Sequence, residues 1–273
     1  MKSTEFRVIV AAIAACFALL GSGVAHGKAS CCADADVIMA SLPGPPQVRE
    51  VMLSEHGVLA CARAGATIID TSTSEPDSTH RLAALCAEKG VVYVDAPLTR
   101  TPIEAEAGKL NSMVGASPEV FAQIEPVIRA YSENVFHVGE MGSGHVIKLL
   151  NNFVAQAICT ATAEAFAVGA KAGIQLEKLV DVISAGGVNS GLFQLMAKTL
   201  QGDYAAMKFE LNNATKDLRY YAHLTESVKV PSIIGGSVHQ ALSTAVALGY
   251  GSEMVPSLVK AQAQLNQVKI GQS

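Results

Sequence analysis

One lysine and one asparagine stand at a spacing that could do chemistry in the segment Gly142–Asn152. Lys148 and Asn152 are four residues apart, so on a helix their side chains would share one face, about one turn from each other. A lysine can hold or release a proton, and an asparagine beside it can orient a polar ligand. A single lysine is more often simply solvated, so its interpretation depends on the elements that position it.

Polar and turn-forming residues follow three short apolar segments in the first half of the chain. Continuous apolar runs of this length are typical of strands buried in a parallel sheet. Ligands bind outside the carboxyl ends of such strands, so the hydroxyl and backbone groups there could line a nucleotide. Each group taken alone also fits ordinary turn chemistry. The segments and the residues that follow them are Asp36–Ser41 with Leu42 and Pro43, Thr67–Asp70 with Thr71–Ser74, and Val91–Asp95 with Ala96–Pro102.

These strands alternate with helical patterns, which predicts an α/β domain with a parallel sheet covered on both faces. Helical periodicity then continues from Gly142 to the C-terminus, interrupted by glycine and proline, so the second half is expected to be all-helical. The segment that carries Lys148 lies at the junction of the two parts, where ligand clefts usually form. Further strands are expected at Leu110–Val114 and Val135–Val138, and helices at Gln47–Leu53, Pro76–Lys89 and Pro118–Tyr131.

Composition excludes several classes of function. With 273 residues, 50% of them hydrophobic and 16% charged, the chain can bury the cores of one large or two ordinary domains. A net charge of −4 gives no electrostatic footprint for nucleic acid. The six cysteines lack CxxC spacing and the seven histidines lack HxxxH spacing, so no metal site is predicted.

The N-terminal segment is laid out like a secretory signal peptide. Lys2 and Arg7 precede the apolar run Val8–Leu20, and small residues follow it. The run is short for a transmembrane helix, so no membrane span is expected. A GxGxxG dinucleotide fingerprint is excluded by spacing, because its third glycine would fall where His26 stands. Residues 1–27 are therefore expected to form an apolar leader, either signal-like or aberrant.

Five motifs, taken together and in order, resemble the β-hydroxyacid dehydrogenases, a family that includes 3-hydroxyisobutyrate dehydrogenase and tartronate semialdehyde reductase. The resemblance runs from about Gly23 to the end of the chain. It implies a truncated Rossmann-like parallel-sheet domain over residues 28–143, followed by an all-helical C-terminal domain over residues 144–273. The motifs are Asp36-Val-Ile with Leu42-Pro43, Asp70-Thr-Ser-Thr73, Asp95-Ala-Pro97, Ala107–Gly115 and Gly142–Asn152, and the helical half adds Lys216-Asp-Leu218.

The resemblance implies oxidation of a short 3-hydroxy acid, or reduction of the matching aldehyde acid, with NAD or NADP as cofactor. It makes Lys148 the general acid/base and gives Asn152 the task of holding the substrate beside it. His145 lies three residues before Lys148 and receives no role from the resemblance. The residues implied in contact with the dinucleotide are Leu42, Pro43, Thr73 and Lys216; the alternative for Lys216 is a solvated charge beside Asp217.

Two departures from the family pattern change these expectations. The family usually carries Ser-Gly-Gly where this chain has Thr99-Arg100-Thr101, a form similar to that of the sulfolactaldehyde reductase branch. A guanidinium suits a carboxylate or sulfonate, so these three residues are expected to bind the anionic group of the substrate, unless Arg100 points to solvent. The second departure is the missing GxGxxG segment, without which a phosphate site is lost and a sheet edge is exposed.

Several functions remain open at this point. The first is an NAD(P)-dependent oxidoreductase for a small anionic hydroxy acid or aldehyde, of the 3-hydroxyisobutyrate, sulfolactaldehyde or tartronate semialdehyde type. The second is a truncated, inactive relative that serves as a binding or dimerisation module, and the third is an exported binding protein for small acids. A homo-oligomer formed through the helical domain is expected. So is a cytoplasmic location, or export if residues 1–27 are a true signal peptide.

Overall fold

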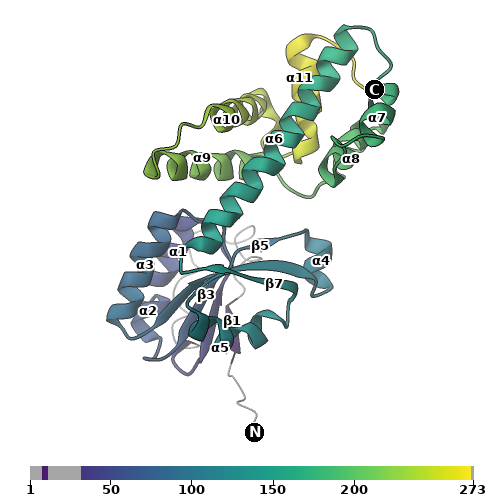
Figure 1. Ribbon diagram of the computed structural model, residues 1–273. Coiled ribbons are helices and arrows are strands. Elements are labelled where there is room, and N and C mark those ends of the chain that lie inside the picture. The colour runs from purple at the N-terminus through teal and green to yellow at the C-terminus, as the bar shows by residue number, and fades with distance from the viewer. Residues whose placement is uncertain (1–7, 12–31, 272–273) are drawn as a thin grey trace. The chain divides into compact units, whose positions relative to one another are not determined.

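The computed structural model describes residues 8–11 and 32–271 and divides into two units, Met1–Lys148 and Leu149–Ser273. Apart from Val8–Ala11, the expected leader over residues 1–27 lies outside the described residues. The first unit contains a sheet flanked by helices, and the described part of the second unit consists of helices joined by turns and loops (Figure 1).

The described part of the first unit holds a seven-stranded mixed sheet in the order β1-β2-β3-β4-β6-β5, with β7 paired to β6. Strands β1 to β4 are parallel to one another, whereas β6 runs antiparallel to both β4 and β5. The strands are β1 (Val8–Ala11), β2 (Val37–Ala40), β3 (Thr67–Asp70), β4 (Val92–Asp95), β5 (Leu98–Thr99), β6 (Leu110–Gly115) and β7 (Ser132–Gly139).

The predicted parallel sheet is confirmed for β1 to β4, and the antiparallel pairings of β6 with β4 and β5 make the whole sheet mixed. Parallel neighbours need a crossover of a dozen or more residues. Between β5 and β6 the chain has room only for the five-residue helix α4 (Pro102–Glu106), so it turns back on itself and pairs antiparallel. The pairing of β6 with β7 is parallel again, because helix α5 (Pro118–Ile128) connects them.

Strand β1 comes from the segment that was expected to be a leader. Val8 lies opposite Val37 and Ala11 opposite Ala40, in a parallel pairing with β2. The β-branched residues of the sequence Val-Ile-Val-Ala favour such a strand. These four residues thus belong to the sheet, and the edge of β2, which the missing segment was expected to leave exposed, is paired.

Two apolar clusters cover the two faces of the sheet. Successive residues of a strand point to opposite faces, and both kinds are buried: Ile68 packs into one cluster and its neighbour Ile69 into the other. Helix α5 packs on the second face through Ile124 and Ile128. The helices on the first face are α1 (Pro45–Leu53), α2 (Val58–Cys61) and α3 (Pro76–Glu88). Coverage on both faces confirms the predicted layering.

Within its described residues the second unit contains helices, the loops between them and one isolated antiparallel bridge between Glu210 and Met254. Helix α6 (Ser143–Lys171) begins in the first unit and continues into the second. It is the one described helix long and apolar enough to cross a membrane, but core helices of soluble proteins pass the same test, so this is weak support for a span. The helices that follow are α7 (Leu176–Ser184), α8 (Gly191–Ala197), α9 (Leu211–Ser227), α10 (Ile233–Ala245) and α11 (Leu258–Asn266).

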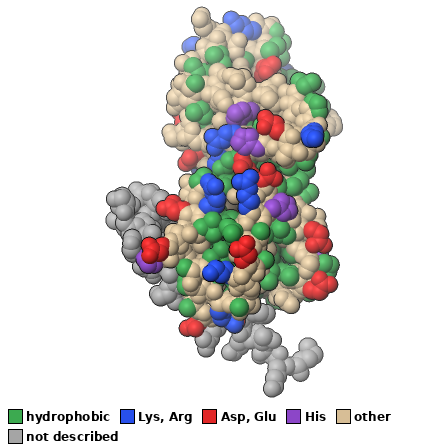
Figure 2. Space-filling view, turned by 90° about the vertical axis from the view of Figure 1, so that its left-hand side faces the viewer, with side chains coloured by type: hydrophobic (Ala, Val, Ile, Leu, Met, Phe, Trp, Pro, Cys, Tyr) green, Lys and Arg blue, Asp and Glu red, His purple; other side chains and the backbone are tan. Residues whose placement is uncertain are grey.

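Charged side chains of both signs are interspersed on the surface shown in Figure 2. Acidic, basic and histidine side chains alternate there with hydrophobic ones, and no broad basic field gathers on the described residues of this face. With a net charge of −4, this face gives no support to nucleic-acid binding.

Candidate active site

The carboxylate of Asp95 holds the beginning of helix α6. Asp95 ends strand β4 and is fully buried; its Oδ1 accepts a hydrogen bond from the Gly142 amide (2.7 Å), and its Oδ2 accepts one from the His145 amide (2.8 Å). A carboxylate at a helix N-terminus satisfies N–H groups that have no partner within the helix, and it interacts favourably with the helix dipole. The helix that carries Lys148 is thereby fixed against the carboxyl end of β4.

The two glycines of the G-x-G motif make this close approach feasible. Gly142 has a φ of +97°, in the left-handed region that favours glycine. A Cβ atom on Gly144 would lie 2.9 Å from the carbonyl oxygen of Asp95 and closer still to that of Met113. Both obstacles are backbone atoms, so a larger residue would push α6 away from the sheet. The motif therefore has a packing reason besides any contact with a ligand.

Lys148 is held by the backbone of strand β5. Its Nζ donates a hydrogen bond to the carbonyl oxygen of Leu98 (2.7 Å), and the side chain is half-buried. Leu98 directly precedes the polar loop Thr99–Thr101, which follows the last parallel strand of the series β1 to β4. The amine thus lies beside the kind of strand-end loop where α/β sheets bind ligands, instead of on a solvated face of α6.

Thr99 and Thr101 use their hydroxyls within the fold. The Thr99 hydroxyl accepts a hydrogen bond from Nδ2 of Asn111 on β6 (3.2 Å). The Thr101 hydroxyl accepts one from the Ile103 amide (3.3 Å) and donates one to the Glu104 carboxylate. The same carboxylate accepts from the Thr101 amide (2.9 Å), which completes a capping box at the start of α4. The hydrogen bonds from the hydroxyl and the amide of Thr101 lower the pKa of the Glu104 carboxyl below its ordinary value. A substrate contact by either threonine stays a prediction.

Arg100 stands where the family pattern has glycine, and its backbone shows why glycine suits the position. Its φ is 83°, which side chains rarely adopt. Nη1 donates to the carbonyl oxygen of Lys109 (2.6 Å) and pairs with the carboxylate of Glu133. In the part of the chain that the structure describes, Nε and Nη2 have no hydrogen-bond partner. Contact between Arg100 and a substrate anion therefore stays a prediction.

His145 is fully buried, and both of its ring nitrogens are hydrogen-bonded. Nε2 lies 3.1 Å from the carbonyl oxygen of Ser72, and Nδ1 lies 2.6 Å from the hydroxyl of Thr79 on α3. Ser72 also accepts a hydrogen bond from the Leu42 amide through its hydroxyl (2.9 Å), and its own amide donates to Asp70 (2.9 Å). One serine thus joins the ends of β2 and β3 to the first turn of α6.

Two buried carboxylates lie side by side at the ends of β3 and β4. Asp70 and Asp95 are partners in the strand register, and both are fully buried. They are satisfied by separate donors, Asp95 by α6 and Asp70 by the Ser72 amide and the Tyr93 hydroxyl (2.6 Å). Burial, and then the Asp70 charge, raise the pKa of Tyr93 well above its ordinary value, so this phenol stays a hydrogen-bond donor.

The ends of β2 and β3 are where the residues expected to contact the dinucleotide lie. Leu42 is buried, Pro43 is exposed and Thr73 is half-buried. Among the described residues the Thr73 hydroxyl has no hydrogen-bond partner, so it is available to a ribose hydroxyl. The segment after β1, where a phosphate-binding turn would lie in the family, is outside the described residues. The contact of Leu42, Pro43 and Thr73 with a dinucleotide stays a prediction.

The second unit brings together two residues that are far apart in the sequence. Nδ2 of Asn152 donates a hydrogen bond to Oδ2 of the buried Asp217 (2.6 Å). Nζ of Lys216 lies 3.5 Å from Oδ1 of Asp217 and 5.8 Å from the centre of the Tyr220 ring. Lys216 thus lies beside Asp217, as expected, but it is partly buried and not fully solvated, and its contact with a cofactor stays a prediction.

The polar face of α6 continues beyond Asn152 within the second unit. Gln156 and Thr160 follow at four-residue spacing, and both are buried. Within the described residues, Oε1 of Gln156 and Oγ1 of Thr160 have no hydrogen-bond partner. Such groups cost stability relative to apolar side chains of the same volume.

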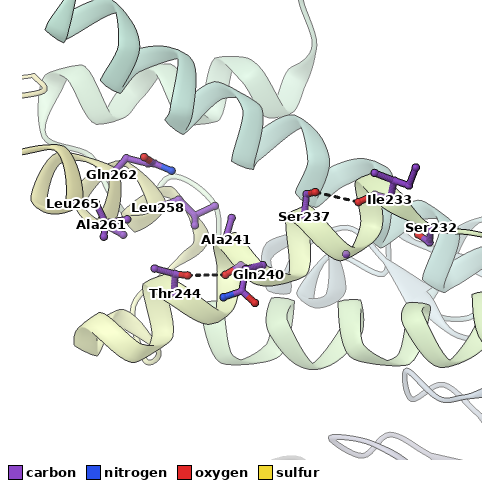
Figure 3. Close-up of a pocket in the computed structure, with 11 residues that line it drawn as sticks. Ser232, Ile233, Ser237, Gln240, Ala241, Thr244, Leu258, Ala261, Gln262 and Leu265 are labelled. Carbon is purple, nitrogen blue, oxygen red and sulfur yellow. Dashed lines mark hydrogen bonds between the residues drawn. The ribbon is translucent and has the colours of Figure 1, made fainter.

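A groove of about 670 Å³ between α10 and α11 is lined by none of these residues (Figure 3). Its hydroxyls bond within their own helix, Ser237 to the Ile233 carbonyl (3.1 Å) and Thr244 to the Gln240 carbonyl (2.8 Å). It contains no titratable side chain, so it cannot supply the proton transfer of a hydroxy-acid reaction. The lining residues are Ser232, Ile233, Gly236, Ser237, Gln240, Ala241, Thr244, Leu258, Ala261, Gln262 and Leu265.

Comparisons with known proteins cover both units. The family model described as the NAD binding domain of 6-phosphogluconate dehydrogenase matches residues 4–139. The one described as the NAD-binding domain of NADP-dependent 3-hydroxyisobutyrate dehydrogenase matches residues 142–261. The first match begins inside the segment that was expected to be a leader, in agreement with the place of β1 in the sheet.

Individual relatives give the same result. The 2-(hydroxymethyl)glutarate dehydrogenase of Eubacterium barkeri is 33% identical over 258 residues, which cover 90% of this chain and 84% of the relative. The 3-hydroxyisobutyrate dehydrogenase of Pseudomonas aeruginosa is 35% identical over 169 residues, 61% of this chain and 57% of the relative. The crystal structure of 3-hydroxyisobutyrate dehydrogenase from Salmonella typhimurium matches with a TM-score of 0.73 at 25% identity, over 84% of this chain and 80% of that one.

Proposed function

The chain belongs to the β-hydroxyacid dehydrogenase family of NAD(P)-dependent oxidoreductases, and from this premise we propose that it interconverts a small 3-hydroxy acid and the matching aldehyde acid, with Lys148 as general acid/base. The observation that carries the proposal is the hydrogen bond from Lys148 Nζ to the Leu98 carbonyl (2.7 Å). It holds an amine beside a strand-end loop on a helix whose beginning is fixed by Asp95.

Lys148 moves the proton of the reaction. In oxidation its neutral amine takes the proton of the substrate hydroxyl while the carbon that bears this hydroxyl loses a hydride. In reduction the ammonium returns that proton to the carbonyl oxygen, where negative charge develops. The nicotinamide, when bound, supplies the hydride chemistry. The Leu98 carbonyl contributes position, because it fixes where the amine stands relative to the loop.

The substrate is proposed to carry a primary hydroxyl one carbon away from the carbon that bears its carboxylate. The names 2-(hydroxymethyl)glutarate and 3-hydroxyisobutyrate, given to the substrates of two relatives, share that arrangement. Asn152, one helical turn after Lys148, would hold the substrate by its amide. The Thr99–Thr101 loop would receive the anionic group through Nε and Nη2 of Arg100, since the described partners of Arg100 bond only to Nη1.

A reductase for a sulfonated aldehyde or for tartronate semialdehyde is the second candidate. The observation that favours it is the arginine at position 100, because a guanidinium can bind a sulfonate or a carboxylate with two parallel hydrogen bonds. The Arg100→Ala variant tests it: KM for anionic aldehydes should rise about tenfold with kcat little changed. An unchanged KM would remove Arg100 from the substrate site.

Lys148→Ala is the direct test of the principal proposal. We expect kcat to fall by roughly 10²–10⁴-fold with little change in the dissociation constants of NADH and NADPH, measured by fluorescence titration. Lys171→Ala, an exposed lysine at the end of the same helix, is the matched control and should retain wild-type kcat. A Lys148→Ala enzyme with wild-type kcat would refute the role of Lys148. The absence of any cofactor-induced shift in melting temperature at millimolar NADH or NADPH would refute turnover by this chain.

A further inference from the structure

We propose that His145 is a positioning residue that holds Lys148 in register with the cofactor-contacting ends of β2 and β3. This inference rests on the proposed function of Lys148. It concerns a histidine whose side chain the general acid/base mechanism does not use, although it lies only one turn before the catalytic lysine.

The His145 ring leaves its own helix for other parts of the first unit. It is fully buried and reaches two segments outside its own helix, the turn after β3 and helix α3. Because a carbonyl oxygen can only accept, the Ser72 contact requires a hydrogen on Nε2 of the ring. Nδ1 is then an acceptor and takes the hydrogen of the Thr79 hydroxyl (2.6 Å). The same hydroxyl lies 3.1 Å from the carbonyl oxygen of Glu75, to which it does not donate in this tautomer because it has a single hydrogen. A buried imidazole with both nitrogens hydrogen-bonded has one favoured orientation, so it fixes the first turn of α6 relative to Ser72 and Thr79.

Ser72, the partner of the His145 ring, is bonded in turn to the end of β2. It lies directly before Thr73, one of the cofactor-contacting residues, and its hydroxyl accepts from the amide of Leu42, another of them. A shift of the His145 ring therefore acts on the Ser72 carbonyl, and through this one residue on the ends of both β2 and β3. The path from Lys148 to the nucleotide edge is three residues long: His145, Ser72 and then Leu42 or Thr73.

The Asp95 cap does not by itself determine the rotation of α6 about its axis. Its two hydrogen bonds go to backbone amides at the very start of α6, so they fix where the helix begins. Rotation of the helix about its own axis is limited by side chains that leave it in different directions. In the first unit, the His145 ring goes to Ser72 and Thr79, and the Lys148 amine goes to Leu98. If the hydrogen bonds of His145 are removed, the rotation of α6 in the first unit is restrained by the Lys148–Leu98 hydrogen bond, which involves the proposed catalytic amine.

The experiment compares His145→Leu, which fills similar space without polar atoms, with His145→Gln, whose amide can donate to Ser72 and accept from Thr79. For His145→Leu we expect kcat to fall by about 10- to 100-fold, as a misplacement near 1 Å can cost, with KM changed far less. His145→Gln should recover most of that loss. Thr79→Val, which removes the partner of Nδ1 from outside α6, should lower kcat in the same direction by less. Ile124→Val, in the apolar cluster on α5, is the control for general destabilisation and should keep kcat within about twofold.

A second readout needs neither cofactor nor turnover. Trinitrobenzenesulfonate labels lysine amines, and peptide mass spectrometry gives the labelling rate of Lys148 between pH 6 and pH 10. Loss of the His145 anchor should change the pH dependence of Lys148 labelling in His145→Leu and leave it at the wild-type profile in His145→Gln and Ile124→Val. This measurement still tests the positioning role if Lys148→Ala shows that the proposed function is wrong.

The proposal is overturned if His145→Leu lowers the melting temperature as Ile124→Val does, while kcat and the labelling profile of Lys148 stay at wild-type values. It is also overturned if His145→Gln loses as much kcat as His145→Leu, because the hydrogen bonds would then not be the cause. If His145→Leu fails to fold, His145→Gln and Thr79→Val decide: a wild-type labelling profile and wild-type kcat in Thr79→Val would reject the anchor.

Discussion

The buried polar groups at helix α6 are hydrogen-bonded to different extents in the two units that the helix belongs to. In the first unit, Asp95 accepts from the helix amides, His145 bonds through both ring nitrogens, and Lys148 bonds to a backbone carbonyl. In the second unit, Gln156 Oε1 and Thr160 Oγ1 have no hydrogen-bond partner among the described residues, although both side chains are buried.

Buried polar groups that are hydrogen-bonded fix the positions of their neighbours, whereas buried polar groups without a partner do not. A fully satisfied buried network specifies a single arrangement, because every alternative leaves a donor or acceptor unpaired. A buried amide without a partner specifies nothing and costs stability. Chemistry that depends on the position of an amine is therefore expected at the beginning of α6, where Lys148 stands, and the same comparison can be tested by substitution.

The strongest test removes the carboxylate at the anchored end. Asp95→Ala deletes two charge-assisted hydrogen bonds to the start of α6, so the free energy of unfolding should fall by roughly 3–5 kcal/mol. Urea denaturation followed by circular dichroism measures the change. The control is Asp181→Ala, since Asp181 forms an exposed pair with Lys178 and should contribute less than about 0.5 kcal/mol. Equal effects of the two substitutions would remove Asp95 as the anchor.

The second test adds a single methyl group at the same end. Gly144→Ala places a Cβ against the backbone carbonyls of Asp95 and Met113, which cannot move aside cheaply, so the free energy of unfolding should fall by about 2–3 kcal/mol. Gly187→Ala is the matched control, because a Cβ there meets no heavy atom within 4 Å. Chemical denaturation of the two variants measures their free energies of unfolding. If Gly144→Ala is as stable as Gly187→Ala, α6 is not packed tightly against the sheet at Gly144.

The third test compares two buried polar side chains of α6 in the second unit, one with a hydrogen-bond partner and one without. Asn152→Leu removes a donor from the buried Asp217 and should lower the free energy of unfolding by roughly 1–2 kcal/mol. Gln156→Leu removes a buried oxygen that has no described partner, so stability should be unchanged or rise by up to about 1 kcal/mol. The two midpoints in urea should therefore move in opposite directions. A large loss from Gln156→Leu would reveal a hydrogen bond, for instance to a buried water.

The smallest effect concerns the loop after β4. Thr101→Val removes the hydroxyl that bonds to Glu104 and holds its pKa down, so that pKa should rise in an NMR titration, while Thr101→Ser should keep it low. A carboxyl whose folded pKa lies below its unfolded value stabilises the fold above the unfolded pKa, and the stabilisation is lost as the pH falls through the folded pKa. The stability difference between Thr101→Val and the wild type should thus be present at neutral pH and shrink in acid. An additional tenfold rise in KM would instead assign Thr101 to the substrate.

Much of the sheet could be predicted because local patterns determine it. Short runs of β-branched residues bounded by polar ends predict β2, β3 and β4 to within one residue at each end. The two-residue strand β5 lies in a polar loop and has no pattern of its own. The direction of β6 depends on which strand it meets, which is a tertiary property. The strand in Val8–Ala11 was hidden by the apolar residues after it, which match a leader equally well.

The site shows the same limit. Motifs identify Lys148, Asn152 and the strand-end loops, because glycine, lysine and asparagine spacing is visible along the chain. Asp95 appears in the sequence only as part of the Asp-Ala-Pro motif, and its task becomes clear from contacts that span 47 and 50 residues. The Ser72 contact of His145 spans 73 residues, and a lone buried histidine carries no sequence signal. Residue identity predicts what a group can do, whereas its partners depend on the fold.

Those long sequence separations also set the order in which the chain can fold. A contact between residues 47 to 73 positions apart requires a large loop to close before any stabilisation is gained. The strand ends that carry Asp70 and Asp95 must be in place before the amides of Gly142 and His145 find their acceptors. The first turn of α6 is thus expected to become protected late in refolding, after the parallel strands. Pulse-labelling hydrogen exchange should then find the Gly142 and His145 amides acquiring protection together, as one cooperative unit with the ends of β3 and β4.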